Sequence, residues 1–372
     1  MTAGGTWPDA DAIASAADLA GRDAADSDAA GGIGNETVEA LTAAGFPGCF
    51  VPRRFGGGDA TFAAVTKAVA AVGEGCASAA WIASLSAYNG RFGAYLPVGG
   101  QEEVWAKGPD TRLVSSMVAA GVEAEPVDGG WSLSGRWLYV SGVEFADWAL
   151  VSSAPPREGD RSVLVFAVPG DSFTYLNTWS TVGMNATGSH TLVVERAFVP
   201  ECRTFVWDDM RRGVLSGPGT TAQSASLFSV NGLTFAAPIL GAARGALRLA
   251  ERHLADRPSG ARAASRESSL IAFTRAAGEI DAAELLLSRV ADTADLGGLA
   301  DGRAERSHRD STLAVEILVG AVDRLFRVTG TRGQGTSHAM QRIWRDVHAA
   351  ASHAALQFEP AALAYTRGLV TG

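Results

Sequence analysis

One strand-like stretch of the sequence, residues 131–148, combines aromatic side chains with a short hydroxyl. Its residues alternate as in an antiparallel strand, so Trp137, Tyr139 and Ser141 are expected to point to one side. Gly142 follows, where the backbone can turn or approach a bound molecule closely. Aromatic walls ending in one hydroxyl suit a flat heterocycle held at its edge by a hydrogen bond. A sandwich strand with a buried aromatic face has the same periodicity, and periodicity alone favours that second interpretation.

A polar stripe is predicted near the C-terminus. If residues 340–355 form one helix, one of its faces carries Arg342, Asp346, Ala349 and His353. Such a stripe among the alanines of a bundle indicates a cavity, where an imidazole with an ordinary pKa of about 6.5 can donate a proton or a hydrogen bond. A surface or interface histidine fits the same pattern, and Arg342 could instead form an exposed ion pair with Asp346. Both interpretations stay open.

The segment Thr329–Ser337 is rich in glycine and hydroxyl residues and leads into the last long helix. Backbone and side-chain donors beside a helix N-terminus make a suitable anion site. The candidate phosphate ligands are Arg332, Thr336 and Ser337. A plain glycine-rich connection is an equally good explanation.

The composition is that of a well-packed globular protein. The chain has 372 residues, of which 47% are hydrophobic and 19% charged. Its formal net charge of −9 disfavours a nucleic-acid partner, which would need a basic face. The sequence lacks a signal peptide, a transmembrane run and any cysteine or histidine spacing typical of a metal site, so we expect a cytoplasmic, metal-free protein.

The elements that must position these residues change character along the chain. Apolar residues recur with helical spacing up to about residue 110, although the first 34 residues predict only a loosely packed helix. Short alternating segments separated by turns then predict an antiparallel sandwich or barrel. Long amphipathic patterns return after residue 218 and predict a helical bundle. The expected domains are a helical domain (1–110), a central β domain (111–215) and a C-terminal bundle (216–372).

This layout and three motifs resemble the acyl-CoA dehydrogenase superfamily. The segment Gly135–Asp147, with its Tyr-Val-Ser step, resembles the family's flavin-contacting strand. Gly183–Ser189 (GMNATGS) resembles the segment that closes the family's β domain, with Asn185 where arginine is usual. Gln341–Asp346 (QRIWRD) resembles the start of its last long helix. The resemblance implies a four-helix bundle in the C-terminal domain.

A missing carboxylate separates the two chemistries of this superfamily. Dehydrogenases need a glutamate to remove a proton from an acyl thioester, and it must lie within hydrogen-bond reach. Neither stretch where the family carries it, Val347–Ala354 and Leu233–Pro238, contains an acid. The chain therefore resembles the two-component flavin-dependent monooxygenases more closely. An FAD-dependent acyl-CoA dehydrogenase is the alternative.

The monooxygenase resemblance implies a reaction and its partners. Reduced FMN or FAD would come from a separate reductase, and O₂ would react through a flavin C4a-hydroperoxide. One oxygen atom would enter a small organic substrate, an aromatic ring or an amine. The subunits would form a homotetramer.

The same resemblance implies roles for individual residues. Ser141 would contact the N5/O4 edge of the flavin, and His353 would face the oxygenated side as the second catalytic residue. The phosphate candidates would bind the flavin of a neighbouring subunit, and Arg342 would also contact the cofactor. Trp81 and Asn89 would face the substrate, although an amide cannot accept a proton at neutral pH. The remaining predicted flavin contacts are Met117, Trp137 and Tyr139, of which Met117 and Trp137 could instead belong to the core.

Overall fold

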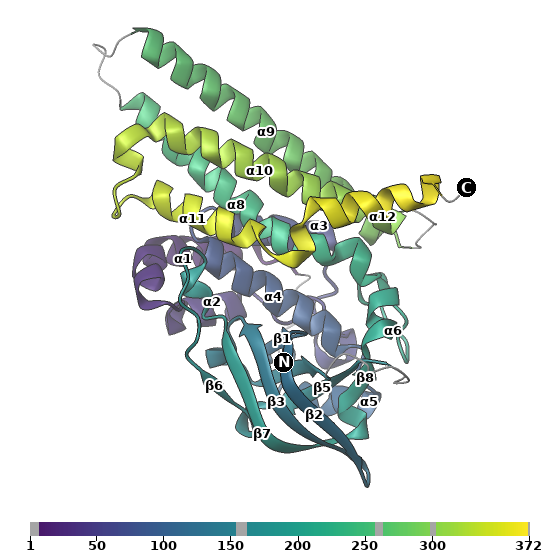
Figure 1. Cartoon of the computed structure of the whole chain (residues 1–372). Coiled ribbons are helices and arrows are strands. Elements are labelled where there is room, and N and C mark those ends of the chain that lie inside the picture. The colour runs from purple at the N-terminus through teal and green to yellow at the C-terminus, as the bar shows by residue number, and fades with distance from the viewer. Residues whose placement is uncertain (1–6, 154–161, 257–262, 298–302, 371–372) are drawn as a thin grey trace.

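The computed structural model describes residues 7–153, 162–256, 263–297 and 303–370. The chain forms a lower β region, a middle layer of N-terminal helices and an upper bundle of C-terminal helices (Figure 1). This order of helices, strands and helices confirms the predicted acyl-CoA dehydrogenase-like fold. The N-terminal helices are α1 (Ala10–Ala30), α2 (Asn35–Ala43), α3 (Phe62–Gly73), α4 (Ala77–Gly93) and α5 (Val98–Val104), of which α5 lies beside the β region.

The β region consists of two four-stranded sheets packed against each other. The first has the order β1 (Leu113–Ser116), β4 (Trp148–Ser152), β5 (Leu164–Pro169), β8 (Thr204–Val206). The second has the order β2 (Ala119–Val127), β3 (Gly130–Val140), β7 (His190–Pro200), β6 (Thr174–Leu176). The expectation of purely antiparallel pairing is wrong at one place, because β1 pairs with β4 in parallel. These two strands are joined through the other sheet, which allows a parallel pair without a crossover helix.

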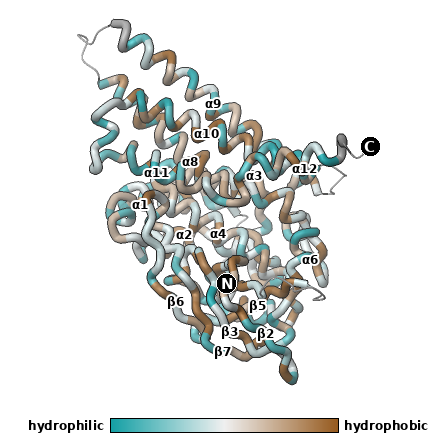
Figure 2. Tube along the Cα trace, viewed as in Figure 1, coloured by the Kyte–Doolittle hydropathy of each residue, from teal (hydrophilic) through white to brown (hydrophobic). Residues whose placement is uncertain are grey.

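The C-terminal bundle is built from long helices that run along one another above α3 and α4 (Figure 1). The short helices α6 (Trp207–Arg212) and α7 (Thr221–Ser224) lead into it. Its members are α8 (Leu227–Ala255), α9 (Ala263–Asp295), α10 (Arg303–Gly333) and α11 (Ala339–Ala351), followed by α12 (Phe358–Val370). Figure 2 shows hydrophobic stretches along the strands and hydrophilic ones where α10 meets α11.

Small residues let the middle layer and the bundle approach closely. A Cβ added to Gly241 of α8 would lie 2.2 Å from the carbonyl oxygen of Ala70 in α3, so only glycine fits there. The first helix packs in the same way, through buried Ile13, Ala16 and Ala20. The expectation that it is loosely packed is therefore wrong, because its alanines permit close contact without large anchors.

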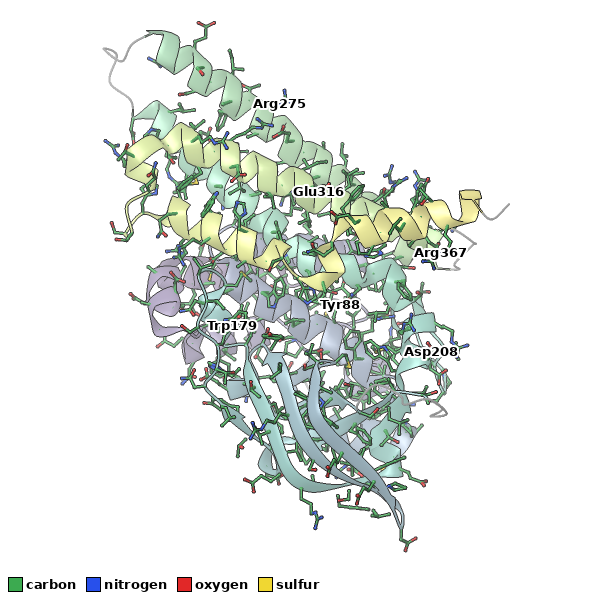
Figure 3. The ribbon with its side chains drawn as sticks, viewed as in Figure 1. Tyr88, Trp179, Asp208, Arg275, Glu316 and Arg367 are labelled. Atoms are coloured by element: carbon green, nitrogen blue, oxygen red, sulfur yellow. The ribbon has the colours of Figure 1, made fainter. Side chains whose placement is uncertain are left out.

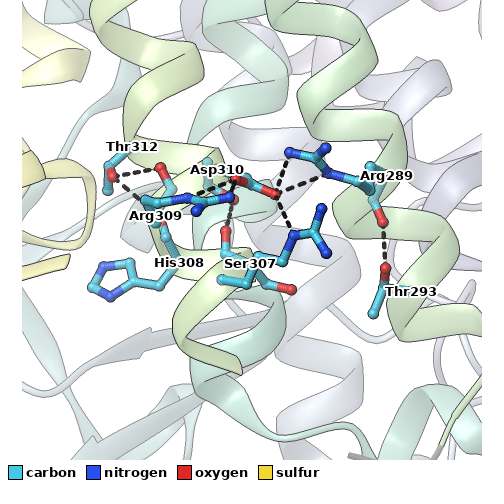
Figure 4. Close-up of polar contacts among 9 residues, drawn as sticks. Arg289, Thr293, Ser307, His308, Arg309, Asp310 and Thr312 are labelled. Carbon is cyan, nitrogen blue, oxygen red and sulfur yellow. Dashed lines mark hydrogen bonds and ion pairs between the residues drawn. The ribbon is translucent and has the colours of Figure 1, made fainter. Parts of the chain in front are cut away.

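A buried carboxylate holds two bundle helices together near the α12 end (Figure 4). Asp310 of α10 is 2% exposed, and its oxygen accepts from Arg289 of α9 at 2.7 Å and 3.0 Å. Arg309 donates to the other oxygen at 2.5 Å and 3.0 Å. Removal of one partner from a buried pair costs about 3–5 kcal/mol, so this cluster fixes the relative position of α9 and α10.

The two domain boundaries stay a prediction, although both fall between elements. Position 110 lies between α5 and β1, and position 215 lies between α6 and α7. Among the described helices, none is both long and apolar enough to span a bilayer.

Candidate active site

The strand that carries Ser141 is distorted just before it. The pairing of β3 with β7 shifts register between Trp137 and Val140, and Tyr139 adopts a left-handed φ of 60°. The strict alternation predicted from sequence is therefore wrong here. Trp137 is 0% exposed and donates from Nε1 to the carbonyl oxygen of Ser152 at 2.7 Å, whereas Tyr139 is 60% exposed.

Trp137 thus belongs to the core between the sheets and cannot wall a ligand at Ser141, which corrects its predicted cofactor contact. Tyr139 can still contact the cofactor, because its ring is exposed. The ring meets Trp179 edge-on at a centroid distance of 6.2 Å. Figure 3 labels Trp179 near the junction of the sheets with the helices. The indole of Trp179 donates to the carbonyl oxygen of Met184 at 3.0 Å and is thereby fixed.

Ser141 itself sits between two sequence-distant partners. Its Oγ accepts from the indole N–H of Trp81 at 3.3 Å and lies 2.7 Å from Oγ of Ser189. Trp81 comes from α4 and is 8% exposed. The structure therefore brings together two of the predicted site residues, Ser141 and Trp81, at the boundary between the β region and the middle layer.

His353 reaches the same indole from the bundle, but not from a helix. The last long helix, α11, ends at Ala351, and His353 caps the short 3₁₀ turn Ala354–Leu356. The predicted stripe is therefore wrong at its last member. The His353 ring stacks on Phe235 at a centroid distance of 3.8 Å and meets Trp81 edge-on at 5.7 Å.

The protonation state of His353 follows from these contacts. Burial against the two rings lowers the pKa of the imidazole from 6.5 to about 4. Its Nδ1 accepts the backbone N–H of Ala355 at 3.2 Å, so the neutral ring carries its proton on Nε2. At neutral pH this side chain offers a hydrogen-bond donor, which differs from the expected imidazole with an ordinary pKa.

The GMNATGS segment is clamped between α1 and α11. Asp346 is 5% exposed and accepts the backbone N–H of Met184 at 2.6 Å. Arg345 pairs with Asp28 of α1 at 2.6 Å. Asn185, which stands where the family usually has arginine, donates to the carbonyl oxygen of Asp28 at 2.8 Å. The turn that ends at Ser189 is therefore held by both helical layers.

Burial also raises the pKa of Asp346 to about 6, against the opposing effect of the Met184 N–H. Arg342, one turn before it, is half-buried and forms no hydrogen bond or ion pair with any residue in the described ranges. It does not form the ion pair with Asp346 that the sequence left open. Its guanidinium remains available to an anion.

A pocket opens on the other side of Ser141, between α2, α4 and β1. Its cavity volume is about 30 Å³, and the surrounding space, open solvent included, is about 450 Å³. Asn89 lines it but is only 2% exposed, and both ends of its amide are already bonded. Its Nδ2 donates to the carbonyl oxygen of Leu113 at 2.9 Å, and its Oδ1 accepts from Ser115 at 2.7 Å. The remaining lining is mainly apolar and includes Ile82, Leu85, Val114 and Phe145.

The other predicted contacts lie farther from this centre or beside it. Met117 is half-buried at the corner between β1 and β2, which Ser116 fixes through a 2.7 Å hydrogen bond to the carbonyl oxygen of Leu138. The phosphate candidates Arg332, Thr336 and Ser337 are all exposed where α10 meets α11. This connection lies at the end of the bundle away from α12 (Figure 1).

Sequence reasoning missed three residues of the site. Phe235 lies in the α8 stretch Leu233–Pro238, where dehydrogenases of the superfamily can carry their catalytic acid. The apolar composition of this stretch was the available sign that its side chains face an apolar site. Ser189 and Thr187 belong to the recognised GMNATGS segment, but their proximity to Ser141 depends on how this turn folds back. Within the described ranges, no group of three or more histidine, cysteine or acidic side chains could hold a metal ion.

Comparisons with known proteins agree with this geometry. The model of the family described as "Acyl-CoA dehydrogenase, C-terminal domain" matches residues 233–358. The oxygenase component of an FADH₂-dependent resorcinol hydroxylase from Rhizobium sp. (strain MTP-10005) is 32% identical over 370 residues. That match covers 93% of this chain and 90% of the relative.

Two solved structures share the whole fold. The 3-HSA hydroxylase from Rhodococcus sp. RHA1 has a TM-score of 0.90 and 26% identity, covering 97% of this chain and 96% of the other. XiaF from Streptomyces sp., in complex with FADH₂ and glycerol, has a TM-score of 0.87 and 25% identity, covering 97% of this chain and 95% of the other. The chain therefore belongs to the two-component flavin-dependent monooxygenases of the acyl-CoA dehydrogenase superfamily, as an oxygenase component.

Proposed function

We propose that this protein hydroxylates a small aromatic compound with reduced flavin and O₂, and that the flavin edge lies against Ser141. The observation that carries the proposal is the convergence of Ser141, Trp81 and His353 from three separate layers on one point. The names of the relatives support an aromatic substrate, since they include a resorcinol hydroxylase, a p-hydroxyphenylacetate 3-hydroxylase and an indole-3-acetate monooxygenase.

The residues present fit a flavin, because they offer what an isoalloxazine edge needs. Ser141 has a free lone pair. The next residue, Gly142, has a left-handed φ of 70° and no side chain, so the backbone can approach the flavin edge closely. Tyr139 adds an exposed ring, and Met117 adds a flexible apolar side chain. When bound, reduced flavin supplies the electrons that activate O₂, so that one oxygen atom reaches the substrate and the other leaves as water.

The protein itself positions the flavin and the substrate and excludes water from the site. Trp81 and Phe235 keep water from the centre, and His353 holds a proton on Nε2 toward it. The substrate lies against the apolar residues beside Ser141, with Asn89 as a wall and not as a base, because its amide is committed to β1. The neutral His353 donates a hydrogen bond to the oxygenated side of the flavin without changing its own charge.

The flavin phosphates require cations, and two places provide them. Arg342 lies half-buried on α11 with no partner among the described residues, and Arg332, Thr336 and Ser337 form an exposed group at the bundle end. We assign the second group to the flavin of a neighbouring subunit in a homotetramer. As an oxygenase component, the protein works with a separate flavin reductase. A cytoplasmic location remains a prediction.

The test supplies FAD or FMN, reduced anaerobically, to the protein together with ¹⁸O₂. A panel of phenols, indoles and aromatic amines is then analysed by mass spectrometry. The proposal predicts one ¹⁸O atom in the product of at least one aromatic compound. Formation of hydrogen peroxide alone with every compound, together with acyl-thioester-dependent reduction of a dye, would identify the dehydrogenase alternative.

A further inference from the structure

A chain of three hydroxyl groups runs from Ser141 into the β region. Oγ of Ser141 lies 2.7 Å from Oγ of Ser189, which lies 2.7 Å from Oγ1 of Thr187. Thr187 in turn lies 2.8 Å from the carbonyl oxygen of Met184. Ser189 and Thr187 are 5% and 3% exposed, so solvent does not compete for these hydrogen bonds.

The direction of every hydrogen bond in this chain is fixed by its last member. A carbonyl oxygen only accepts, so Thr187 must donate its single hydroxyl proton to Met184. Thr187 can then only accept from Ser189, and Ser189 can then only accept from Ser141. The proton of Ser141 is therefore committed to the protein interior.

The Met184 carbonyl that sets this order is itself immobile. Its peptide N–H donates to buried Asp346 at 2.6 Å, and its carbonyl oxygen also accepts from Trp179 at 3.0 Å. The backbone of the turn is tied to the end of β3, because the N–H of Gly142 donates to the carbonyl oxygen of Thr187 at 3.0 Å. Reversal of the hydroxyl chain would lose the hydrogen bond from Thr187 to this carbonyl oxygen.

Ser141 consequently presents only lone pairs toward the cleft. One accepts from the indole N–H of Trp81, and one remains for a ligand. A reduced flavin carries a hydrogen on N5 and can donate it, whereas N5 of an oxidised flavin has no hydrogen and can only accept. We propose that Ser189 and Thr187 are specificity residues that make this site select reduced over oxidised flavin. The inference rests on the proposed contact between Ser141 and the flavin N5 edge.

The experiment compares dissociation constants for reduced and oxidised FAD, measured anaerobically at one salt concentration. Ser189→Ala leaves the Ser141 proton free to point at oxidised flavin, and Thr187→Val lets Ser189 reverse. Each variant is expected to lower the ratio of oxidised to reduced dissociation constants about five- to tenfold, mainly by tightening oxidised FAD. A tenfold change in this ratio appears independently as a shift of about 30 mV in the two-electron potential of the bound flavin.

Two matched variants separate this role from a structural one. Thr187→Ser retains the hydroxyl and should keep the wild-type ratio. Thr178→Val breaks a 2.8 Å hydroxyl pair with Thr191 of β7, outside the hydroxyl chain, and should also leave the ratio unchanged. If Ser189→Ala does not fold, the isosteric Thr187→Val still decides the question.

The possible failures differ. A wild-type ratio in both Ser189→Ala and Thr187→Val, or an equal drop in Thr178→Val, would overturn the inference and leave the proposed function standing. Failure of wild-type protein to bind FAD in either redox state would overturn both.

Discussion

Trp81 contacts Ser141 on its β side and His353 on its bundle side, and the structure fixes the hydrogen positions of these two residues in different ways. On the β side, the Ser141 hydroxyl is ordered by a chain of hydrogen bonds that ends on a fixed carbonyl. On the bundle side, His353 has no charged partner among the residues that the structure describes, and burial against Phe235 and Trp81 keeps it neutral by lowering its pKa to about 4. The β side therefore accepts a hydrogen bond, and the bundle side donates one.

The indole of Trp81 contacts a polar group on one side and a ring on the other. The Trp81 N–H donates a hydrogen bond to Ser141, and the Trp81 ring packs edge-on against the imidazole of His353. Tryptophan suits this position because it combines a large apolar surface with one donor. Changes at Trp81 should affect both sides, whereas changes at Ser141 or His353 should affect one.

The largest effect is expected from Trp81→Ala, which empties a site that is 8% exposed in the wild type. Loss of a buried aromatic side chain should lower the free energy of unfolding by about 3–5 kcal/mol. Trp81→Phe keeps a ring against His353 but removes the donor to Ser141 and part of the indole volume, so it should cost less, about 2 kcal/mol. Urea denaturation of the three proteins measures this, and equal losses in both variants would show that the ring contacts contribute nothing.

His353→Phe should come next, because it retains the stack on Phe235 and removes the Nε2 donor. Product formed per reduced flavin oxidised is expected to fall by about 10²-fold, a typical effect for a positioned proton donor. The control is His348→Ala, a half-exposed histidine of α11 that bonds to Asp323 at 3.0 Å. Its yield should match the wild type. An unchanged yield in His353→Phe would remove His353 from the catalytic site.

Ser141→Ala tests the β side and should have a smaller effect. The dissociation constant for reduced FAD is expected to rise about five- to tenfold, since one hydrogen bond to the ligand is lost. Ser86→Ala, another hydroxyl on the lining of the same pocket, serves as the control and should not change it. Equal affinities in Ser141→Ala and wild type would place the flavin edge elsewhere.

The smallest effect concerns pH and has opposite signs at two residues. The lowered pKa of His353 contributes stability that is fully present above about 6.5 and is lost as the pH falls through about 4. The raised pKa of Asp346 contributes stability that is present below its unfolded value of about 3.9 and is lost as the pH rises through about 6. Between pH 4 and 6 the two contributions therefore oppose each other.

Acidification from pH 7 to pH 5 should thus destabilise His353→Gln less than the wild type and Asp346→Asn more, each by about 1 kcal/mol. Urea titrations at the two pH values give these differences. Parallel behaviour of both variants with the wild type would contradict the assigned burial of these groups.

Periodicity and motif order sufficed to predict the layered fold and the Trp81 helix, whereas the role of Ser141 stays a prediction. The bulge that separates Trp137 from Tyr139 was not predictable, because alternation carries no mark of a register shift. The end of α11 at Ala351 was equally hidden, since the alanine-rich sequence continues with good helix formers. His353 nonetheless reaches Trp81, because the turn after the helix places it there.

The chain of hydroxyl groups from Ser141 to Thr187 could not be predicted from the sequence for a different reason. Ser141 and Ser189 are 48 positions apart, and Met184 is fixed by Asp346 from 162 positions away. Sequence shows hydroxyl residues in a recognised segment, but the direction of their hydrogen bonds depends on which carbonyl ends the chain. That carbonyl is set by tertiary contacts with α1 and α11.

The most direct test of the central claim mixes wild-type protein, loaded anaerobically with reduced FAD, with O₂ in the absence of substrate. Oxygen consumption and the return of oxidised-flavin absorbance are recorded together. We predict that O₂ is consumed well before the oxidised absorbance returns, because the packed side chains of Trp81, Phe235 and His353 would keep water from the flavin edge. Simultaneous traces, with tight binding of oxidised FAD that an acyl thioester then bleaches, would contradict a monooxygenase.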